Sequence, residues 1–212
     1  MHPALGLVVA YLAGSIPAAY LAGKAKGIDL RQHGSGNLGT TNVFRVLGWQ
    51  LGVLVFVVDF AKGALPVWLL PDLATSATEQ GRQLWAIAFG VAAIAGHVKP
   101  IFLLGRGGGK GVATASGVFF ALAPLAIVVV SSLFAIAVSV TGIVSLGSLI
   151  GAAVLPIAVF VLQGSTPVFW LSLAVGLFVV WTHRANIRRL ARGEEPSFRK
   201  RGAAGTPPAG SA

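Results

Sequence analysis

The stretch GVATASGVFFALAPLAIVVVSSLFAIAVSV, residues 111–140, opens the run of sequence that decides the class of fold. From Gly111 to His183 the chain contains no Asp, Glu, Lys or Arg. This run is far longer than a buried core helix, so it must cross a lipid bilayer several times. Over the whole chain, hydrophobic residues make up 55% and charged residues only 10%, which is too few charges to cover a water-soluble surface. The sequence therefore predicts an all-α, polytopic membrane protein.

The distribution of charge predicts the topology. Apolar segments occupy residues 3–23, 47–71, 84–104, 112–140, 143–162 and 167–182. Basic residues gather after the first, third and last segments, whereas the connection after the second, PDLATSATEQGR, carries two acids and one arginine. By the positive-inside rule, the basic connections are cytoplasmic and this one is outside.

Parity then fixes the number of spans. Lys110 and Arg184 both lie on the cytoplasmic side, so the chain between them must cross an even number of times. The segment 112–140 is too long for one span and has Pro124 near its middle, so we predict two short helices, 112–123 and 125–140. The prediction is seven transmembrane helices, with the N-terminus outside and the C-terminus cytoplasmic.

The two ends of the chain differ in character. The start, MHPALGLVVAYLAG, lacks a basic region before its apolar run, so we expect a retained first helix and not a cleaved signal peptide. After residue 195 the sequence becomes rich in Gly, Ala and Pro. We predict a membrane domain over 1–195 and a disordered tail over 196–212. The chain has no cysteine, which excludes disulfides and thiolate metal sites.

Four polar segments share the predicted cytoplasmic face: 31–45, 96–114, 141–148 and 183–195. The net charge of +10 must lie largely in these loops and in the tail. Basic loops facing anionic lipid explain it in the simplest way, and an anionic substrate is the more specific explanation. We expect no nucleic-acid partner.

The segment GHVKPIFLLGRGGGKGVAT, 96–114, superficially resembles a nucleotide-binding loop. A Walker A motif requires Ser or Thr directly after its lysine and a glycine where Leu104 stands, whereas Lys110 is followed by Gly111. Backbone N–H groups beside a lysine can still bind a phosphate-like anion. Lys110 is the strongest candidate anion ligand, flanked by three glycines, and His97 is either a further ligand or an interfacial histidine. Those glycines are Gly108, Gly109 and Gly111.

Residues 33–45 combine a glycine-rich turn with a helix start. Thr41 and Arg45 lie four residues apart on one helix face, and Asn42 precedes Arg45 by three, so hydroxyl, amide and guanidinium groups converge. Such a cluster suits a phosphate, and a plain turn capped by Ser35 or an asparagine is an equal alternative.

Other polar residues give weaker signals. His183 and Asn186 share a helix face, while Arg188, Arg189 and Arg192 are better interpreted as anchors for lipid headgroups. Asp59 and Lys62, three apart inside a span, form either a functional pair or an ion pair that orients the helix. Ser145 and Ser148 are typical helix caps. No spacing of His, Asp or Glu indicates a catalytic metal, and we expect no cofactor.

Taken together, these segments resemble the bacterial membrane glycerol-3-phosphate acyltransferases that use acyl phosphate, the PlsY family. SGNLGTTNVFR resembles its S-G-N-x-G-[AT]-T-N-x-x-R motif, and HRANIRRLARGEE its H-R-x-N-I-x-R-L-x-x-G-x-E motif. The segment 96–114 resembles its G-H-x-x-P…G-G-K-G-V-A-T motif, with one residue more between Pro100 and Lys110 than the family pattern has. VSLGS and the D-x-x-K-G segment beginning at Asp59 also look like family segments.

The resemblance implies a seven-helix fold and transfer of a fatty acyl group from acyl phosphate to the sn-1 hydroxyl of glycerol 3-phosphate, giving lysophosphatidate. It implies a bacterial cytoplasmic membrane location, an active site facing the cytoplasm, and functional coupling to an enzyme that produces acyl phosphate. It assigns phosphate binding to Arg45, Lys110, His183, Asn186 and Ser148, places Ser35, Thr41 and Asn42 along the site, and makes Glu195 a supporting residue. The alternatives are a transporter for a phosphorylated solute and a structural membrane subunit, which would leave the anion ligands unexplained.

Overall fold

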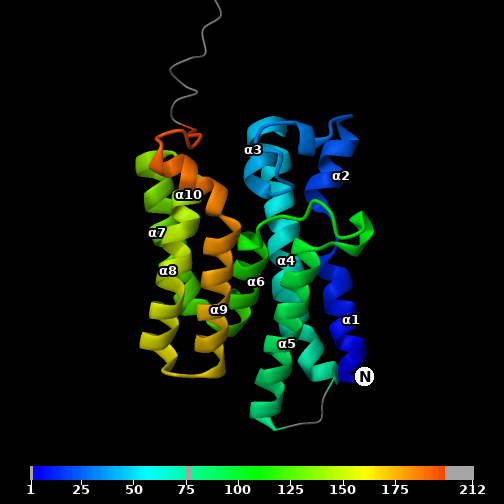
Figure 1. Ribbon diagram of the computed structural model, residues 1–212. Helices are drawn as coiled ribbons and strands as arrows, with labels where there is room; N and C mark the ends of the chain where they lie inside the picture. The colour runs from blue at the N-terminus through cyan, green and yellow to red at the C-terminus, as the bar shows by residue number, and fades with distance from the viewer. Residues whose placement is uncertain (1, 75–77, 199–212) are drawn as a thin grey trace, which may run out of the picture.

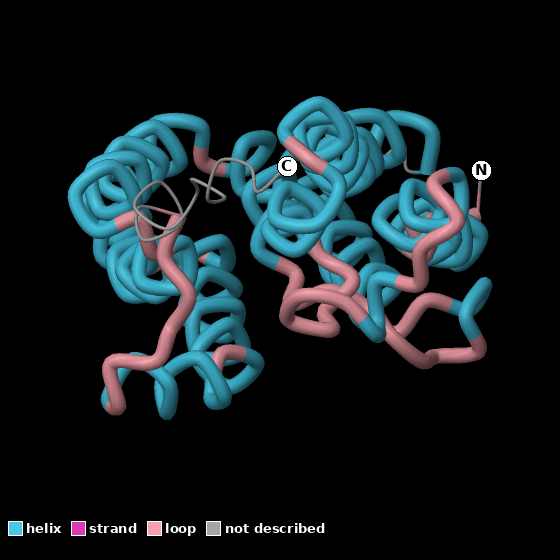
Figure 2. Tube along the Cα trace, turned by 90° about the horizontal axis from the view of Figure 1, so that it is seen from above, coloured by secondary structure: helices cyan, strands magenta, loops and turns pink. Residues whose placement is uncertain are grey.

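The computed structural model describes residues 2–74 and 78–198, and every regular element in these two ranges is a helix (Figures 1 and 2). The longer helices run side by side, and the short helices 18–25, 40–47 and 184–191 lie at one end (Figure 1). In chain order the helices are α1 (Pro3–Gly14), α2 (Ala18–Ala25), η1 (Leu30–Gln32), α3 (Thr40–Leu47), α4 (Trp49–Ala74), α5 (Glu79–Val98), η2 (Ile101–Leu103), α6 (Val112–Leu122), α7 (Pro124–Thr141), α8 (Val144–Gln163), α9 (Pro167–Thr182) and α10 (Arg184–Ala191).

Five stretches of the described chain are long and apolar enough to cross a membrane: Pro3–Ala25, Trp49–Leu73, Glu79–Leu103, Pro124–Thr141 and Val144–Gln163. The pair α9 and α10, bent by 59°, would make a sixth, and α6 is a shorter apolar helix of 11 residues. An all-helical membrane fold is thus confirmed. The seven-span topology and the placement of the termini stay predictions.

Prolines and caps explain where the helices begin and end. The predicted division of 112–140 is confirmed, because α6 ends at Leu122 and α7 begins at Pro124, where a proline ring fits a first helical turn. Helix α5 begins five residues before the apolar segment that we predicted at 84, because the Thr78 hydroxyl caps a polar first turn at Gly81.

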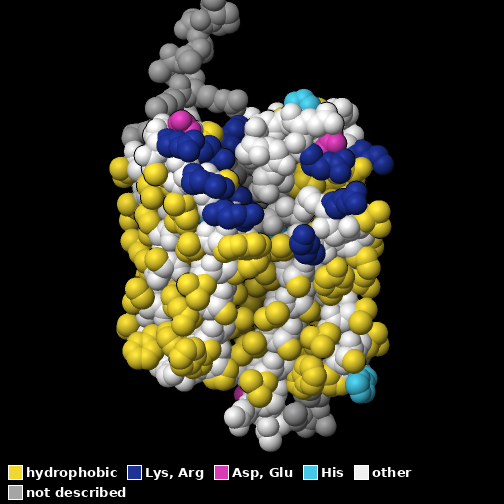
Figure 3. All heavy atoms as spheres, in the orientation of Figure 1, with side chains coloured by type: hydrophobic (Ala, Val, Ile, Leu, Met, Phe, Trp, Pro, Cys, Tyr) yellow, Lys and Arg dark blue, Asp and Glu magenta, His cyan; other side chains and the backbone are white. Residues whose placement is uncertain are grey.

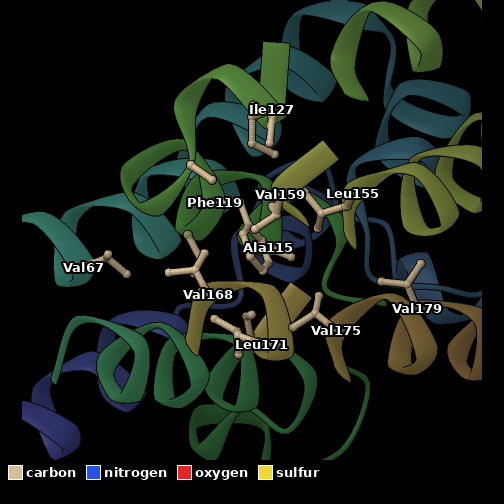
Figure 4. Packing of buried hydrophobic residues seen from close by; sticks show 14 of the residues in the cluster. Val67, Ala115, Phe119, Ile127, Leu155, Val159, Val168, Leu171, Val175 and Val179 are labelled. Carbon is tan, nitrogen blue, oxygen red and sulfur yellow. The ribbon is translucent and has the colours of Figure 1, made fainter. Parts of the chain in front are cut away.

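The core lies where α6 packs among α4, α5, α7, α8 and α9. Figure 4 shows Ala115 and Phe119 of α6 surrounded by side chains of neighbouring helices, among them Leu155 and Val175. Two glycines allow α4 and α6 to approach closely, since a Cβ on Gly63 would collide with the Thr114 carbonyl oxygen, and one on Gly117 with that of Phe60.

The surface divides into a charged end and a hydrophobic band. In Figure 3, Lys and Arg side chains gather at the end that carries α3 and α10, and hydrophobic side chains cover the face below. Leu125 of α7, Val161 of α8 and Leu177 of α9 are among the exposed large hydrophobic residues. A band of this kind is what a helical protein presents to lipid.

The predicted tail lies mostly outside the described residues, which end at 198. Its first residues pack against the turn between α7 and α8. The Ser197 hydroxyl donates to the Thr141 carbonyl oxygen (2.9 Å), and the Phe198 N–H donates to that of Gly142 (3.0 Å).

Candidate functional site

A cavity of about 620 Å³ opens at the charged end of the helices and continues between them. Most of the site residues predicted from the sequence line it: Ser35, Thr41, Asn42, Arg45, Asp59, His97, Lys110, Gly111, Ser145, Ser148, His183, Asn186 and Glu195. The rest of the wall is apolar and includes Phe119, Phe134 and Leu155. Gly108, Gly109 and Lys62 lie outside it, around a void of about 10 Å³ that Asp59 and His97 also line. The four polar segments, distant in sequence, thus meet at one site.

Lys110 belongs to a hydrogen-bonded chain that crosses the cavity wall. Its ammonium donates to Asn186 Oδ1, and Asn186 Nδ2 donates to Glu195 Oε1 over 2.6 Å. The Ser145 hydroxyl donates to the same carboxylate oxygen (2.7 Å), and Arg189 Nε donates to Glu195 Oε2 (2.7 Å). The amide of Asn186 is therefore fixed, with its oxygen facing the ammonium.

Burial shifts the pKa values of the charged side chains at the two ends of this hydrogen-bonded chain, Lys110 and Glu195. It lowers the pKa of Lys110 to about 8; the nearby Arg189 and Arg45 act in the same direction, and Glu195 opposes them. Burial alone would raise the pKa of Glu195, but the hydrogen bonds from Asn186, Ser145 and Arg189 outweigh it and hold this pKa below its usual range. A partly desolvated ammonium and an ionised carboxylate result, separated by one amide.

His183 closes the last long helix and is 4% exposed. Its Nδ1 lies 2.8 Å from the Val179 carbonyl oxygen, which fixes the proton on Nδ1 and leaves Nε2 for another partner. Ser148, predicted as a phosphate ligand, donates its hydroxyl to the Val144 carbonyl oxygen (3.1 Å) and keeps its lone pairs for an acceptor role.

Asn42 shapes the turn that precedes α3. Its Oδ1 accepts from the Ser35 N–H (2.9 Å), and its Nδ2 donates to the carbonyl oxygens of Leu30 and His33 (3.2 and 3.0 Å). The predicted ligand is thus occupied with backbone groups and holds the turn in place. On the same helix, the Arg45 guanidinium carbon lies 5.5 Å from the centre of the Phe198 ring.

Asp59 and Lys62 form an ion pair, which was one of the two interpretations of their spacing. Lys62 Nζ lies 2.8 Å from Asp59 Oδ1, and it also donates to the Ile16 carbonyl oxygen (2.9 Å) in the break between α1 and α2. His97 faces the same carboxylate oxygen, with its Nδ1 3.7 Å away.

Several cavity residues were not found from the sequence. Arg189, interpreted as a headgroup anchor, instead binds Glu195 at the cavity wall. Its spacing of three from Asn186 placed both on one helix face and could have indicated this. Asn37 and Ser116 also line the cavity, and no spacing singled them out. Phe198 lines it from the tail, where the composition gave no signal. Among the described residues, no group of three His, Asp or Glu side chains could hold a metal ion.

The fold and the cavity together define an integral membrane protein that can hold an anionic group at its polar end and a hydrocarbon chain at its apolar end. The family model for glycerol-3-phosphate acyltransferase matches residues 4–193. The chain therefore belongs to the glycerol-3-phosphate acyltransferase family, and the resemblance seen in the motifs is confirmed.

Individual relatives agree with this assignment. The chain is 44% identical over 190 residues to a glycerol-3-phosphate acyltransferase of Trichlorobacter lovleyi, covering 90% of this chain and 94% of the relative. It is 46% identical over 187 residues to one of Anaeromyxobacter dehalogenans, covering 87% and 92%. A crystal structure of PlsY (YgiH), an integral membrane glycerol 3-phosphate acyltransferase in its glycerol 3-phosphate form, is similar with a TM-score of 0.86 and 34% identity, covering 96% of this chain and 99% of that one.

Proposed function

We propose that this protein transfers a fatty acyl group from acyl phosphate to the sn-1 hydroxyl of glycerol 3-phosphate, forming lysophosphatidate and phosphate. The transfer is direct and forms no acyl-enzyme. The observation that carries the proposal is the single cavity whose cationic end, with Lys110 and Arg45, continues into an apolar end lined by residues such as Phe134 and Leu155. Acyl phosphate has the same two parts, and the family relation supports glycerol 3-phosphate as acceptor.

The chemistry asks for positioning more than for a nucleophile, because acyl phosphate is already an activated anhydride. Lys110 and Arg45 hold the phosphate groups, and the unprotonated Nε2 of His183 accepts from a hydroxyl of glycerol 3-phosphate. The backbone N–H groups at Gly111 and the start of α6 stabilise the tetrahedral oxyanion. The acceptor oxygen forms the new ester bond as the bond between acyl carbon and phosphate oxygen breaks.

The proton of the acceptor hydroxyl goes to the departing phosphate. The two carboxylates at the cavity are already engaged, since Glu195 accepts from Asn186 and Arg189, and Asp59 is paired with Lys62. Replacing His183 or Ser35 by Ala tests this route. A variant that still binds both substrates and yet has lost turnover would identify a protein base and contradict it.

We further propose that the protein lies in the bacterial cytoplasmic membrane with its cavity open to the cytoplasm. The cluster of Lys and Arg at the cavity end supports this orientation (Figure 3). An enzyme that produces acyl phosphate would then supply the donor on the same side.

The decisive experiment measures phosphate release by the purified protein in detergent, from acyl phosphate with and without glycerol 3-phosphate. Acceptor-dependent release, with lysophosphatidate as product, is expected; Lys110→Ala should remove it, and Lys99→Ala, an exposed lysine outside the cavity, should not. Absence of turnover together with uptake of glycerol 3-phosphate into vesicles would instead identify a transporter.

A further inference from the structure

The glycine loop, residues 107–111, carries Lys110 and lies directly on the C-terminal end of α5. A Cβ on Gly108 would collide with the backbone carbonyl groups of Val98 and His97, and a Cβ on Gly109 would collide with His97 Nε2. No side chain therefore fits between this part of the loop and α5. The position of Lys110, the next residue, depends on the surface that lies beneath Gly109.

That surface is the imidazole ring of His97, which is 7% exposed. Its Nε2 edge contacts Gly109, and its Nδ1 edge faces Asp59 Oδ1 at 3.7 Å. Asp59 is in turn fixed by Lys62, whose ammonium also binds the Ile16 carbonyl oxygen. A continuous set of contacts thus connects the break between α1 and α2 to the loop that carries Lys110.

We propose that His97 is a positioning residue: its imidazole, oriented by Asp59, supports Gly109 and thereby sets the position of Lys110 in the cavity. The proposal rests on the proposed acyl transfer, in which Lys110 holds a phosphate group. It gives the Asp59–Lys62 pair a role in the reaction although Lys62 lies outside the cavity.

A double-mutant cycle between the ring and the loop tests the contact. Gly109→Ala pushes the loop away from the ring, and a displacement of this order is expected to lower kcat/KM about 100-fold. His97→Ala also lowers kcat/KM, because the loop loses its support. In the double variant the ring is gone, and the remaining neighbour of the new methyl group is the Leu38 carbonyl oxygen at 3.3 Å, so kcat/KM should lie within about threefold of His97→Ala alone. A double variant that loses the product of the two single losses would overturn the proposal.

A second cycle tests whether Asp59 acts through His97. Asp59→Asn should lower kcat/KM in the wild-type background and have little further effect in the His97→Ala background. An equal loss in both backgrounds would show that Asp59 acts only through the packing of α4, and would refute its part of the proposal. For the glycine substitution of the first cycle, the matched control is Gly105→Asn. Gly105 has a left-handed φ of +70° that Asn tolerates, and a Cβ there meets nothing within 4 Å.

The melting temperature of each variant is measured in parallel, and kcat/KM is taken per folded protein. Turnover by the wild type tests the proposed function separately. If the wild type does not turn over, calorimetry measures the dissociation constant for glycerol 3-phosphate in each variant of the first cycle in place of kcat/KM. Coupling between the two substitutions in that constant supports the loop placement, and independent effects refute it.

Discussion

Glu195→Gln is the substitution that probes the Lys110 site most directly without touching the lysine. The carboxylate of Glu195 accepts from Asn186, Ser145 and Arg189. Gln has nearly the same shape but only one acceptor oxygen. Its NH₂ group can replace Oε2 and face Arg189, or replace Oε1 and face two donors. The first arrangement loses fewer hydrogen bonds and is the one expected.

The cost follows from this arrangement. The lost contact with Arg189 costs about 1 kcal/mol, because that side chain is 36% exposed and water partly replaces the partner. The bonds from Asn186 and Ser145 then end on a neutral oxygen and lose about half their strength, or about 1 kcal/mol in all. We expect a loss of about 2 kcal/mol in the free energy of unfolding.

The same change alters Lys110 through electrostatics. The negative charge of Glu195 raises the pKa of Lys110 against burial, so its removal lowers that pKa below the wild-type value of about 8. In the proposed reaction the ammonium must be charged to hold a phosphate, so the alkaline limb of kcat/KM moves toward lower pH.

The assay compares kcat/KM at pH values on both sides of 8, together with thermal unfolding in detergent, for Glu195→Gln and for Glu194→Gln. Glu194 is the neighbouring exposed residue, so its variant makes the same charge change away from the hydrogen-bonded chain. The reasoning is refuted if both variants melt alike and both keep the wild-type alkaline limb.

Three further outcomes are expected. In the wild type, kcat/KM should fall about tenfold per pH unit above about 8 as Lys110 loses its proton. The contribution of Lys110 to stability should rise with pH between its folded and unfolded pKa values, because the folded state releases the proton first. Thermal melts over the same pH range distinguish loss of activity from unfolding, and unfolding that accompanies the loss of activity would contradict the assignment of the alkaline limb to Lys110. Gly117→Val should cost about 3 kcal/mol or more and lower the melting temperature, because its side chain collides with the Phe60 carbonyl oxygen; an unchanged melt would show that α4 and α6 can separate freely. Val130→Trp narrows the apolar end of the cavity and should raise the ratio of kcat/KM for shorter over longer acyl phosphates by about tenfold or more, because each methylene that no longer fits loses about 0.8 kcal/mol of burial. Competition between donors of different length measures this ratio, and an unchanged ratio would place the acyl chain elsewhere.

The sequence predicted the helices best where a local signal marks their ends. Residues 167–182 form α9 as predicted, because the Thr166 hydroxyl caps its start, Pro167 occupies the first turn and His183 follows its end. The break at Pro124 is equally local. The start of α5 was missed because its first turn is polar, so hydropathy alone placed the helix too late.

The candidate site was predicted as a set of residues but not as an arrangement. His183 and Asn186 both line the cavity, but His183 lies in the 59° bend between α9 and α10 and not, as the spacing had predicted, on one helix with Asn186. Motif spacing could not show that Ser145, fifty residues before Glu195, would donate to its carboxylate, nor that Asn42 would bind the backbone of the preceding turn. Contacts between segments distant in sequence depend on how helices pack, and single-sequence periodicity carries no information about that packing.

The arrangement of carboxylates explains how the site can stay cationic while its charges are buried. A site for phosphate groups needs desolvated cations, yet a desolvated cation is most easily stabilised by a resident carboxylate, which would cancel its charge. In the described chain no carboxylate forms an ion pair with Lys110: Glu195 pairs with Arg189 and reaches Lys110 only through the neutral amide of Asn186. Asp59 pairs with Lys62 beneath the glycine loop. The pKa of Lys110 is lowered as a consequence, because burial outweighs the attraction of Glu195 and the nearby Arg189 and Arg45 add to its effect.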